Sequence, residues 1–171
     1  MDFKIEPATI NDAAAINALV NSGYRGDLSK QGWTTEADLL DGTRSDLTLI
    51  EEILRKPDSK IIKYVESNEI LGCMELRNER PKLYLGMLTV RPNLQGKGIG
   101  KKLLEYAEAE AKKLGLDTIR MTVIERRIEL VNWYARHGYI KKEVKPFDIN
   151  DPRFGIPKVK LEFVVMEKSL G

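Results

Sequence analysis

The sequence predicts one α+β domain of three layers, in which a mixed, mostly antiparallel sheet of about seven strands has about four helices on its two faces. Two observations predict it. Short β-branched or alternating runs are interspersed with segments of helical period, and the length of 171 residues is usual for one domain. Because the chain has no internal repeat and no low-complexity linker, we expect residues 1–171 to form a single domain.

The first half of the chain predicts an edge strand, two helices and a meander. Apolar and charged residues alternate in the N-terminal strand, and Asn11 or Thr9 can cap the helix after it. Three strand-like runs separated by turn residues then indicate antiparallel pairing. The expected strands cover Phe3 to Glu6, Lys60 to Glu66, Ile70 to Arg77 and Leu83 to Arg91, and the helices run to about Asn21 and over Asp46 to Lys56.

The second half predicts two more helices and three more strands. Ile99, Leu103, Ala107, Ala111 and Leu114 recur at steps of three and four, which is typical of a helix with one apolar face. The glycine that follows is well placed to end this helix. The remaining elements are expected as a strand over Thr118 to Ile124, a helix over Ile128 to His137, and closing strands over Tyr139 to Val144 and Val159 to Met166.

Composition excludes several classes of protein. The net charge of +2 comes from interleaved acidic and basic residues, so no nucleic-acid-binding face is expected. The N-terminus lacks the apolar region of a signal peptide, and no apolar run is long enough for a membrane span, so we expect a cytoplasmic protein. The single cysteine, Cys73, and the single histidine, His137, argue against a disulfide, a zinc site and a Cys/His nucleophile.

A glycine-rich turn, Gln95-Gly96-Lys97-Gly98-Ile99-Gly100, joins the strand ending at Val90 to the next helix. Its alternating glycines let the backbone pass close to a ligand, and the start of a helix favours an anion. Neighbouring lysines, Lys97 and Lys101 among them, add positive charge. The turn therefore predicts a site for phosphate or pyrophosphate; the alternative is an ordinary turn whose lysines face solvent.

Two familiar phosphate loops do not match this turn. The dinucleotide fingerprint requires a further glycine where Lys101 stands, and the P-loop requires a glycine where Gln95 stands. Instead, Gln95, Gly98 and Gly100 fit the pattern Gln/Arg-x-x-Gly-x-Gly/Ala. With the strand before it and the helix after it, the segment resembles the acetyl-CoA motif of the GNAT family of N-acetyltransferases.

The resemblance implies acetyl-CoA as the co-substrate and implies no metal. Pantetheine would run beside the strand at Leu88, Thr89 and Val90, and the pyrophosphate would lie on the amides of the turn. The residues that the resemblance assigns to the cofactor are Leu88, Thr89, Val90, Gln95, Gly96, Lys97, Gly98, Ile99, Gly100 and Lys101.

Tyr134, in Trp133-Tyr134-Ala135-Arg136-His137-Gly138-Tyr139, resembles the tyrosine of a second family motif. The resemblance implies that its hydroxyl protonates the departing coenzyme A thiolate, a step that a positioned neutral acid assists. Its helical spacing with Leu130 and His137 is equally compatible with core packing. One departure stands out: Arg127 lies where the family often has an asparagine that contacts pantetheine. His137 is taken as structural.

A base must take a proton from the amine before it attacks. Glu75 is the carboxylate in an otherwise apolar strand centre, which makes it the candidate; a solvent-facing position is the alternative. The resemblance implies that the segment Gly32 to Arg44 forms the acceptor wall. There Trp33 offers an aromatic face for a cationic amine, and Glu36, Asp38 and Asp41 offer countercharge. The same carboxylates would also suit a helix cap.

These observations predict an acetyl-CoA-dependent N-acetyltransferase that acts on a small-molecule primary amine by direct transfer in a ternary complex. Two other functions remain open, a protein or peptide N-acetyltransferase and a non-catalytic acyl-CoA sensor. The sensor would keep the glycine turn and would not need Tyr134. No nucleic-acid or membrane partner is expected, and the sequence leaves a homodimer open.

Overall fold

The computed structural model describes residues 2–24, 40–41, 46–146, 156–157 and 161–171. Within them, a seven-stranded sheet has the strand order β1–β3–β4–β5–β6–β9–β7. In this sheet, β5 and β6 pair in parallel. The strands are β1 (Phe3–Pro7), β3 (Ser59–Glu66), β4 (Glu69–Glu79), β5 (Lys82–Val90), β6 (Thr118–Ile124), β7 (Ile140–Pro146) and β9 (Glu162–Ser169). A separate pair joins β2 (Leu40–Asp41) to β8 (Ile156–Pro157).

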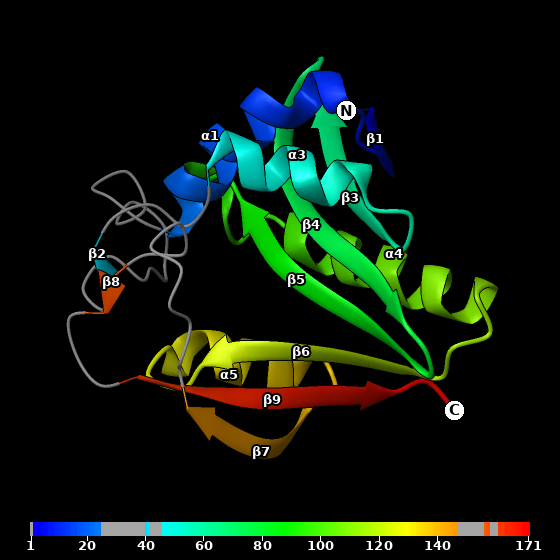
Figure 1. The fold of residues 1–171 in the computed structure, drawn as a ribbon, viewed down its shortest axis with the longest axis vertical. Helices are drawn as coiled ribbons and strands as arrows, with labels where there is room; N and C mark the ends of the chain where they lie inside the picture. The colour runs from blue at the N-terminus through cyan, green and yellow to red at the C-terminus, as the bar shows by residue number, and fades with distance from the viewer. Residues whose placement is uncertain (1, 25–39, 42–45, 147–155, 158–160) are drawn as a thin grey trace.

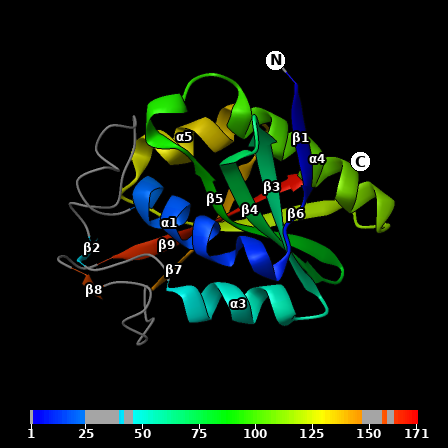
Figure 2. The same cartoon turned by 90° about the horizontal axis from the view of Figure 1, so that it is seen from above.

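Four described helices cover the two faces of this sheet (Figure 1, Figure 2). Helices α1 (Ala13–Tyr24) and α3 (Leu47–Arg55) lie on one face, and α4 (Ile99–Lys113) and α5 (Ile128–Arg136) lie on the other. The expected three-layer α+β architecture is confirmed. Short 3₁₀ turns at Ile10–Asp12 and Pro92–Leu94 lead toward α1 and α4.

Local chemistry sets the ends of the helices. The Asp12 carboxylate accepts a hydrogen bond from the Thr9 backbone N–H at 2.8 Å, and Asp46 accepts one from the Leu49 N–H at 2.8 Å. Both bonds satisfy amides that a helix start leaves without a partner in the helix. At the other end of α4 and α5, Gly115 and Gly138 adopt φ values of 74° and 95°, which favour glycine.

The apolar side chains form a separate cluster on each face of the sheet. The larger cluster joins β3, β4, β5, β6 and β9 to α4 and α5, and includes Leu103, Met121 and Tyr134. The other cluster joins α1 and α3 to Ile61 and Cys73, among others. The sheet centre is therefore buried from both sides, which explains its continuous apolar runs.

The carboxyl ends of β5 and β6 separate. These strands pair only at Leu83–Ile119 and Tyr84–Arg120, and Figure 1 shows them diverging from there. On the other side of β5, the register with β4 shifts between Cys73 and Glu75, and Met87 adopts a left-handed φ of 58°. This bulge increases the local twist of β5. The fold thereby opens a gap in the sheet beside Leu88–Val90.

Several boundaries differ from those expected. Helix α1 continues through Gly23 to Tyr24 instead of ending near Asn21. The last strand continues to Ser169 instead of Met166, because its pairing with β6 extends to Thr118. The strand expected over Tyr139 to Val144 is β7, which covers Ile140–Pro146. The expected start of the last strand at Val159 lies outside the described residues.

Candidate functional site

The glycine turn connects β5 to α4 as expected, but its glycines serve different purposes. Gly96 and Gly98 adopt φ values of 84° and 86°, where other residues are strained, and their surroundings are open. Gly98 is the N-cap of α4 and gives no side-chain hydrogen bond. Because glycine has no side chain, nothing at this position caps the first amides of α4. The helix start is therefore suited to an anion.

Gly100 has a packing role that the sequence did not indicate. A Cβ at this position would lie 3.2 Å from Cη2 and 3.3 Å from Cζ2 of Trp133. Glycine thus lets the first turn of α4 lie directly against the indole on α5. A hydrogen bond also joins the turn to β5, because Gln95 Nε2 donates to the Val90 carbonyl oxygen at 3.3 Å.

A cavity of about 440 Å³ lies beside this turn and extends along α5. We call it the turn cavity. Nine of the ten residues assigned to the cofactor line it; Lys97, which is exposed, does not. Six further residues complete the lining that the structure describes. The full lining is Leu88, Thr89, Val90, Leu94, Gln95, Gly96, Gly98, Ile99, Gly100, Lys101, Arg127, Leu130, Trp133, Arg136 and His137.

The charge of the turn cavity has one sign. Lys101, Arg127 and Arg136 line it, and its described lining contains no aspartate or glutamate. Arg127 is only 5% exposed although its side chain carries a charge. A cavity with positive side chains and a helix N-terminus at one end suits an elongated anion with an apolar part, because Leu88, Leu130 and Trp133 supply apolar wall.

Sequence reasoning missed the wall that α5 contributes. Leu130, Trp133 and His137 follow one another at steps of three and four and line the cavity together. The rings of Trp133 and His137 lie 4.3 Å apart, and His137 Nδ1 donates to the Trp133 carbonyl oxygen at 2.7 Å. His137, expected to be structural, therefore also borders the cavity. The spacing of Leu130, Trp133 and His137 along the helix is the signal that could have indicated this face.

Tyr134 is buried, with 4% of its surface exposed, and belongs to the larger apolar cluster. Its ring contacts Trp133 edge-on at a centroid distance of 5.2 Å and Tyr139 at 5.8 Å. It lies next to a residue of the turn cavity and is not among the residues lining it. Burial, together with the Glu108 carboxylate, raises the pKa of the neighbouring Tyr139.

Glu75 lies on the other face of the sheet. It is opposite Ile61 and Gly86 in the ladder and two residues after Cys73, which belongs to the cluster with α1 and α3. Only 7% of it is exposed, so the solvent-facing alternative is wrong. The structure therefore places Glu75 and Tyr134 on opposite faces of the sheet.

Arg77 holds Glu75 in a polar cluster on that face. Its Nη1 is 3.4 Å from Glu75 Oε2, its Nε donates to Glu79 at 2.7 Å, and its guanidinium lies 4.3 Å from the Tyr84 ring centroid. Burial alone would lower the pKa of Arg77, but the Glu75 and Glu79 carboxylates outweigh it and raise that pKa. Arg77 thus stays charged.

Of the other sequence-based candidates, the structure describes Cys73 and leaves two outside the described residues. Trp33 and Glu36 lie outside the described residues. Cys73 is fully buried, and burial raises the pKa of its thiol to about 12, so a thiolate role at neutral pH is ruled out. Within the described ranges, no cluster of three or more His, Cys, Asp or Glu side chains could hold a metal, and no helix is long and apolar enough to cross a membrane.

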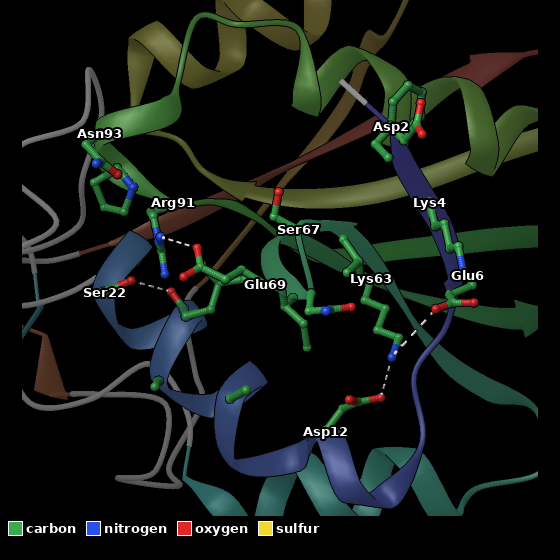
Figure 3. A pocket seen from close by; sticks show the side chains of 18 residues that line it. Asp2, Lys4, Glu6, Asp12, Ser22, Lys63, Ser67, Glu69, Arg91 and Asn93 are labelled. Atoms are coloured by element: carbon green, nitrogen blue, oxygen red, sulfur yellow. Dashed lines mark hydrogen bonds and ion pairs between the residues drawn. The ribbon is translucent and has the colours of Figure 1, made fainter.

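A second, larger hollow of about 1070 Å³ lies between β1, α1, the β3–β4 turn and the segment after β5 (Figure 3). Its charged side chains face one another. Lys63 Nζ is 3.0 Å from Asp12 and 3.8 Å from Glu6, and Arg91 Nη1 is 3.2 Å from Glu69. Because these cations already have carboxylate partners, the hollow lacks the one-signed charge that distinguishes the turn cavity.

Comparisons with known proteins agree with this geometry. A family model described as an acetyltransferase (GNAT) domain matches residues 28–151. A curated relative from Ralstonia nicotianae, named an amino-acid acetyltransferase, is 33% identical over 138 residues, which are 77% of this chain and 29% of that protein. The chain therefore spans less than a third of that relative's length.

Solved structures show the same fold. An N-acetyltransferase from Staphylococcus aureus Mu50 superposes with a TM-score of 0.75 at 18% identity, with 99% of each chain covered. The PaiA N-acetyltransferase from Thermoplasma acidophilum, whose structure is a complex with coenzyme A, superposes with a TM-score of 0.70 at 20% identity and 99% coverage of each chain.

Proposed function

This chain belongs to the acetyltransferase (GNAT) family, and from that premise we propose that it transfers an acetyl group from acetyl-CoA to a primary amine. The observation that carries the proposal is the turn cavity, in which an uncapped helix start, three cationic side chains and an apolar wall border one hollow. Coenzyme A has the matching chemistry, with phosphates at one end and a neutral, partly apolar arm at the other.

The cofactor is proposed to run from the turn toward the gap between β5 and β6. Its pyrophosphate would take the amides from Gln95 to Gly100, with Lys101 and Arg136 supplying positive charge nearby. Its pantetheine arm would lie along Leu88–Val90, where the bulge and the end of the β5–β6 pairing interrupt the sheet. The family match and the presence of coenzyme A in the Thermoplasma structure support coenzyme A as the ligand.

Direct transfer then requires three contributions from the protein. Backbone amides near Leu88 and Thr89 would stabilise the negative charge that develops on the thioester oxygen. Tyr134 would protonate the departing thiolate, and Glu75, through water, would accept the proton of the amine. The residue types and the burial of Tyr134 and Glu75 support these two roles. Their placement on opposite faces of the sheet is compatible with donor and acceptor entering from opposite sides of the gap.

The acceptor is proposed to be a small molecule. The support is the segment containing Trp33 and Glu36, whose residue types suit a small cationic amine. Because one relative is named an amino-acid acetyltransferase and another solved relative a ribosomal-protein-S18-alanine N-acetyltransferase, a panel of acceptors should contain amino acids, polyamines and a peptide with a free N-terminus. Preferred turnover of the peptide would replace the small-molecule proposal.

The test combines acetyl-CoA binding by calorimetry with release of free thiol in the presence of that panel. Gly98→Val is expected to abolish binding, because it adds bulk and strain where the phosphate amides lie. Gly115→Val is the matched control, since Gly115 also has a positive φ, of 74°, in open surroundings and stands at the far end of α4.

Each result has a distinct meaning. Loss of binding in both variants would indicate general destabilisation, and retained binding in Gly98→Val would remove the turn from the cofactor site. Binding by the unaltered protein without turnover of any amine would favour a non-catalytic acyl-CoA sensor. No binding at all would overturn the proposed function.

A further inference from the structure

Glu75 is a buried carboxylate with apolar neighbours on its face of the sheet. Ile61, opposite it in the ladder, and Cys73, two residues before it, both belong to the cluster with α1 and α3. Burial disfavours the charged form of a carboxyl group, whereas a cation within about 4–6 Å favours it. Because only the charged form can accept a proton from an amine, a base at position 75 needs a cationic partner that stays in place.

Arg77 supplies this cation from the same strand. The two residues are two positions apart on β4, so their side chains project to the same face of the sheet. Arg77 Nη1 lies 3.4 Å from Glu75 Oε2, which is long for a hydrogen bond but within the range of an ion pair. The contact is therefore mainly one of opposite charges, and it depends on where the guanidinium is held.

Two further contacts hold the guanidinium of Arg77. Its Nε donates to Glu79 Oε2 at 2.7 Å, and its Cζ lies 4.3 Å from the ring centroid of Tyr84, the residue opposite Arg77 in the ladder with β5. A cation over an aromatic face is attracted to it. The planar fork of arginine can meet a carboxylate on each side and a ring on its face at once, which lysine cannot do.

A glycine in β5 makes room for the ring under Arg77. Gly86 lies opposite Glu75 in the ladder, and a Cβ at this position would lie 2.8 Å from Cε1 and 3.0 Å from Oη of Tyr84. The Tyr84 ring therefore covers Gly86, and a larger residue there would push the ring away from this place. Glycine within a strand weakens the strand and often marks a close approach. Here the approach brings the ring that supports Arg77 next to Glu75.

We propose that Arg77 is a positioning residue for the base, in that it keeps the Glu75 carboxylate ionised and directed while Glu79 and Tyr84 keep Arg77 in place. This role rests on the proposed function, in which Glu75 takes the proton of the amine through water. In that step an N–H bond of the ammonium breaks, its proton goes to water, and water passes a proton to Glu75. The electron pair left on nitrogen then attacks the thioester carbon. Arg77 acts through Glu75 and exchanges no proton.

A double-mutant cycle between positions 75 and 77 tests this role. It measures kcat for the amine of the panel that is turned over fastest, together with acetyl-CoA affinity by calorimetry. We expect Arg77→Gln to lower kcat by about 10- to 100-fold, the effect of a misplaced catalytic group. Acetyl-CoA affinity should not change, because neither residue lines the turn cavity. In a Glu75→Gln background no base is left to position, so Arg77→Gln should lower kcat no further.

Three further variants sharpen the test. Arg77→Lys keeps the charge without the fork and should show a smaller loss of kcat. Arg120→Gln is the matched control, because Arg120 lies opposite Tyr84 on β6, is 31% exposed against 33% for the Arg77 side chain, and pairs with Glu143 instead of Glu75; it should leave kcat unchanged. If Arg77→Gln does not fold, Tyr84→Leu removes the supporting ring and should lower kcat only where Glu75 is present.

Unchanged kcat in Arg77→Gln would overturn the positioning role. An equal loss in both backgrounds would overturn it as well, since that result assigns Arg77 a structural role that is independent of Glu75. If Glu75→Gln alone keeps the full kcat, Glu75 is not the base and Arg77 positions nothing, but acetyl transfer stands. If the unaltered protein turns over no amine, the proposed function fails and the role of Arg77 fails with it.

Discussion

Replacing Gly100 with alanine tests how α4 meets α5 beside the turn. The added Cβ would lie 3.2 Å and 3.3 Å from two carbons of the Trp133 ring, whereas carbon atoms normally approach to about 3.5–4.0 Å. The indole cannot easily move, because its ring also contacts Tyr134 and His137, at 5.2 Å and 4.3 Å between centroids. Overpacking of this kind costs about 1–3 kcal/mol.

The helical preference of alanine over glycine offsets up to about 1 kcal/mol of that cost. We therefore expect Gly100→Ala to lower the free energy of unfolding by about 1 kcal/mol. In a Trp133→Phe background the smaller ring leaves room, and the same change should be neutral or stabilising. The expected coupling energy between the two sites is about 1–2 kcal/mol.

Urea denaturation of the four proteins, followed by circular dichroism, measures this coupling. Because Trp133 lines the turn cavity, Gly100→Ala should also weaken acetyl-CoA binding, and the double variant should recover part of the loss. Additive effects on stability, within about 0.5 kcal/mol, would refute the packing explanation. Gly100 would then be explained by ligand approach alone.

Three other predictions concern single residues. Tyr134→Phe should lower kcat by about 100-fold with KM little changed, and an unchanged kcat in the thiol-release assay would remove Tyr134 from the chemistry. Cys73, whose pKa burial raises to about 12, should not react with a thiol reagent at pH 8 until urea unfolds the protein; fast reaction in the native state would contradict its burial. Burial alone would raise the pKa of Asp12, but the Thr9 N–H and Lys63 outweigh it and lower that pKa. The contacts of the charged carboxylate therefore stabilise the fold at neutral pH, and this stabilisation is lost as the pH falls below about 4. Asp12→Ala should accordingly cost about 1 kcal/mol at pH 7, with a difference from the unaltered protein that shrinks on acidification, and a constant difference would refute this account.

The elements with strong local patterns could be predicted from the sequence. The step of three and four residues from Ile99 and the β-branched run at Thr118–Ile124 gave α4 and β6 with their observed bounds to within a residue or two. The glycine turn could be predicted because Gly96 and Gly98 are required by local backbone conformation. Such features depend on neighbours in sequence.

Features that depend on contacts between distant elements could not be predicted. Position 87 has a left-handed backbone although it holds methionine and not glycine or asparagine, and the bulge there arises from the pairing of β5 with β4. Helical spacing placed Tyr134 and His137 on one face but could not tell which of its residues meet the cavity. The structure puts Trp133 and His137 on the cavity and Tyr134 behind them, because α4 packs against the indole at Gly100.

The central claim is that the turn before α4 holds the phosphates of acetyl-CoA. A ¹⁵N-labelled sample titrated with acetyl-CoA tests it directly, since glycine amides are resolved in such spectra. We predict large, saturable shifts at Gly96, Gly98 and Gly100, with Gly115 at the far end of α4 unchanged. Saturable binding that leaves the three turn amides unshifted, or shifts Gly115 equally, would contradict it.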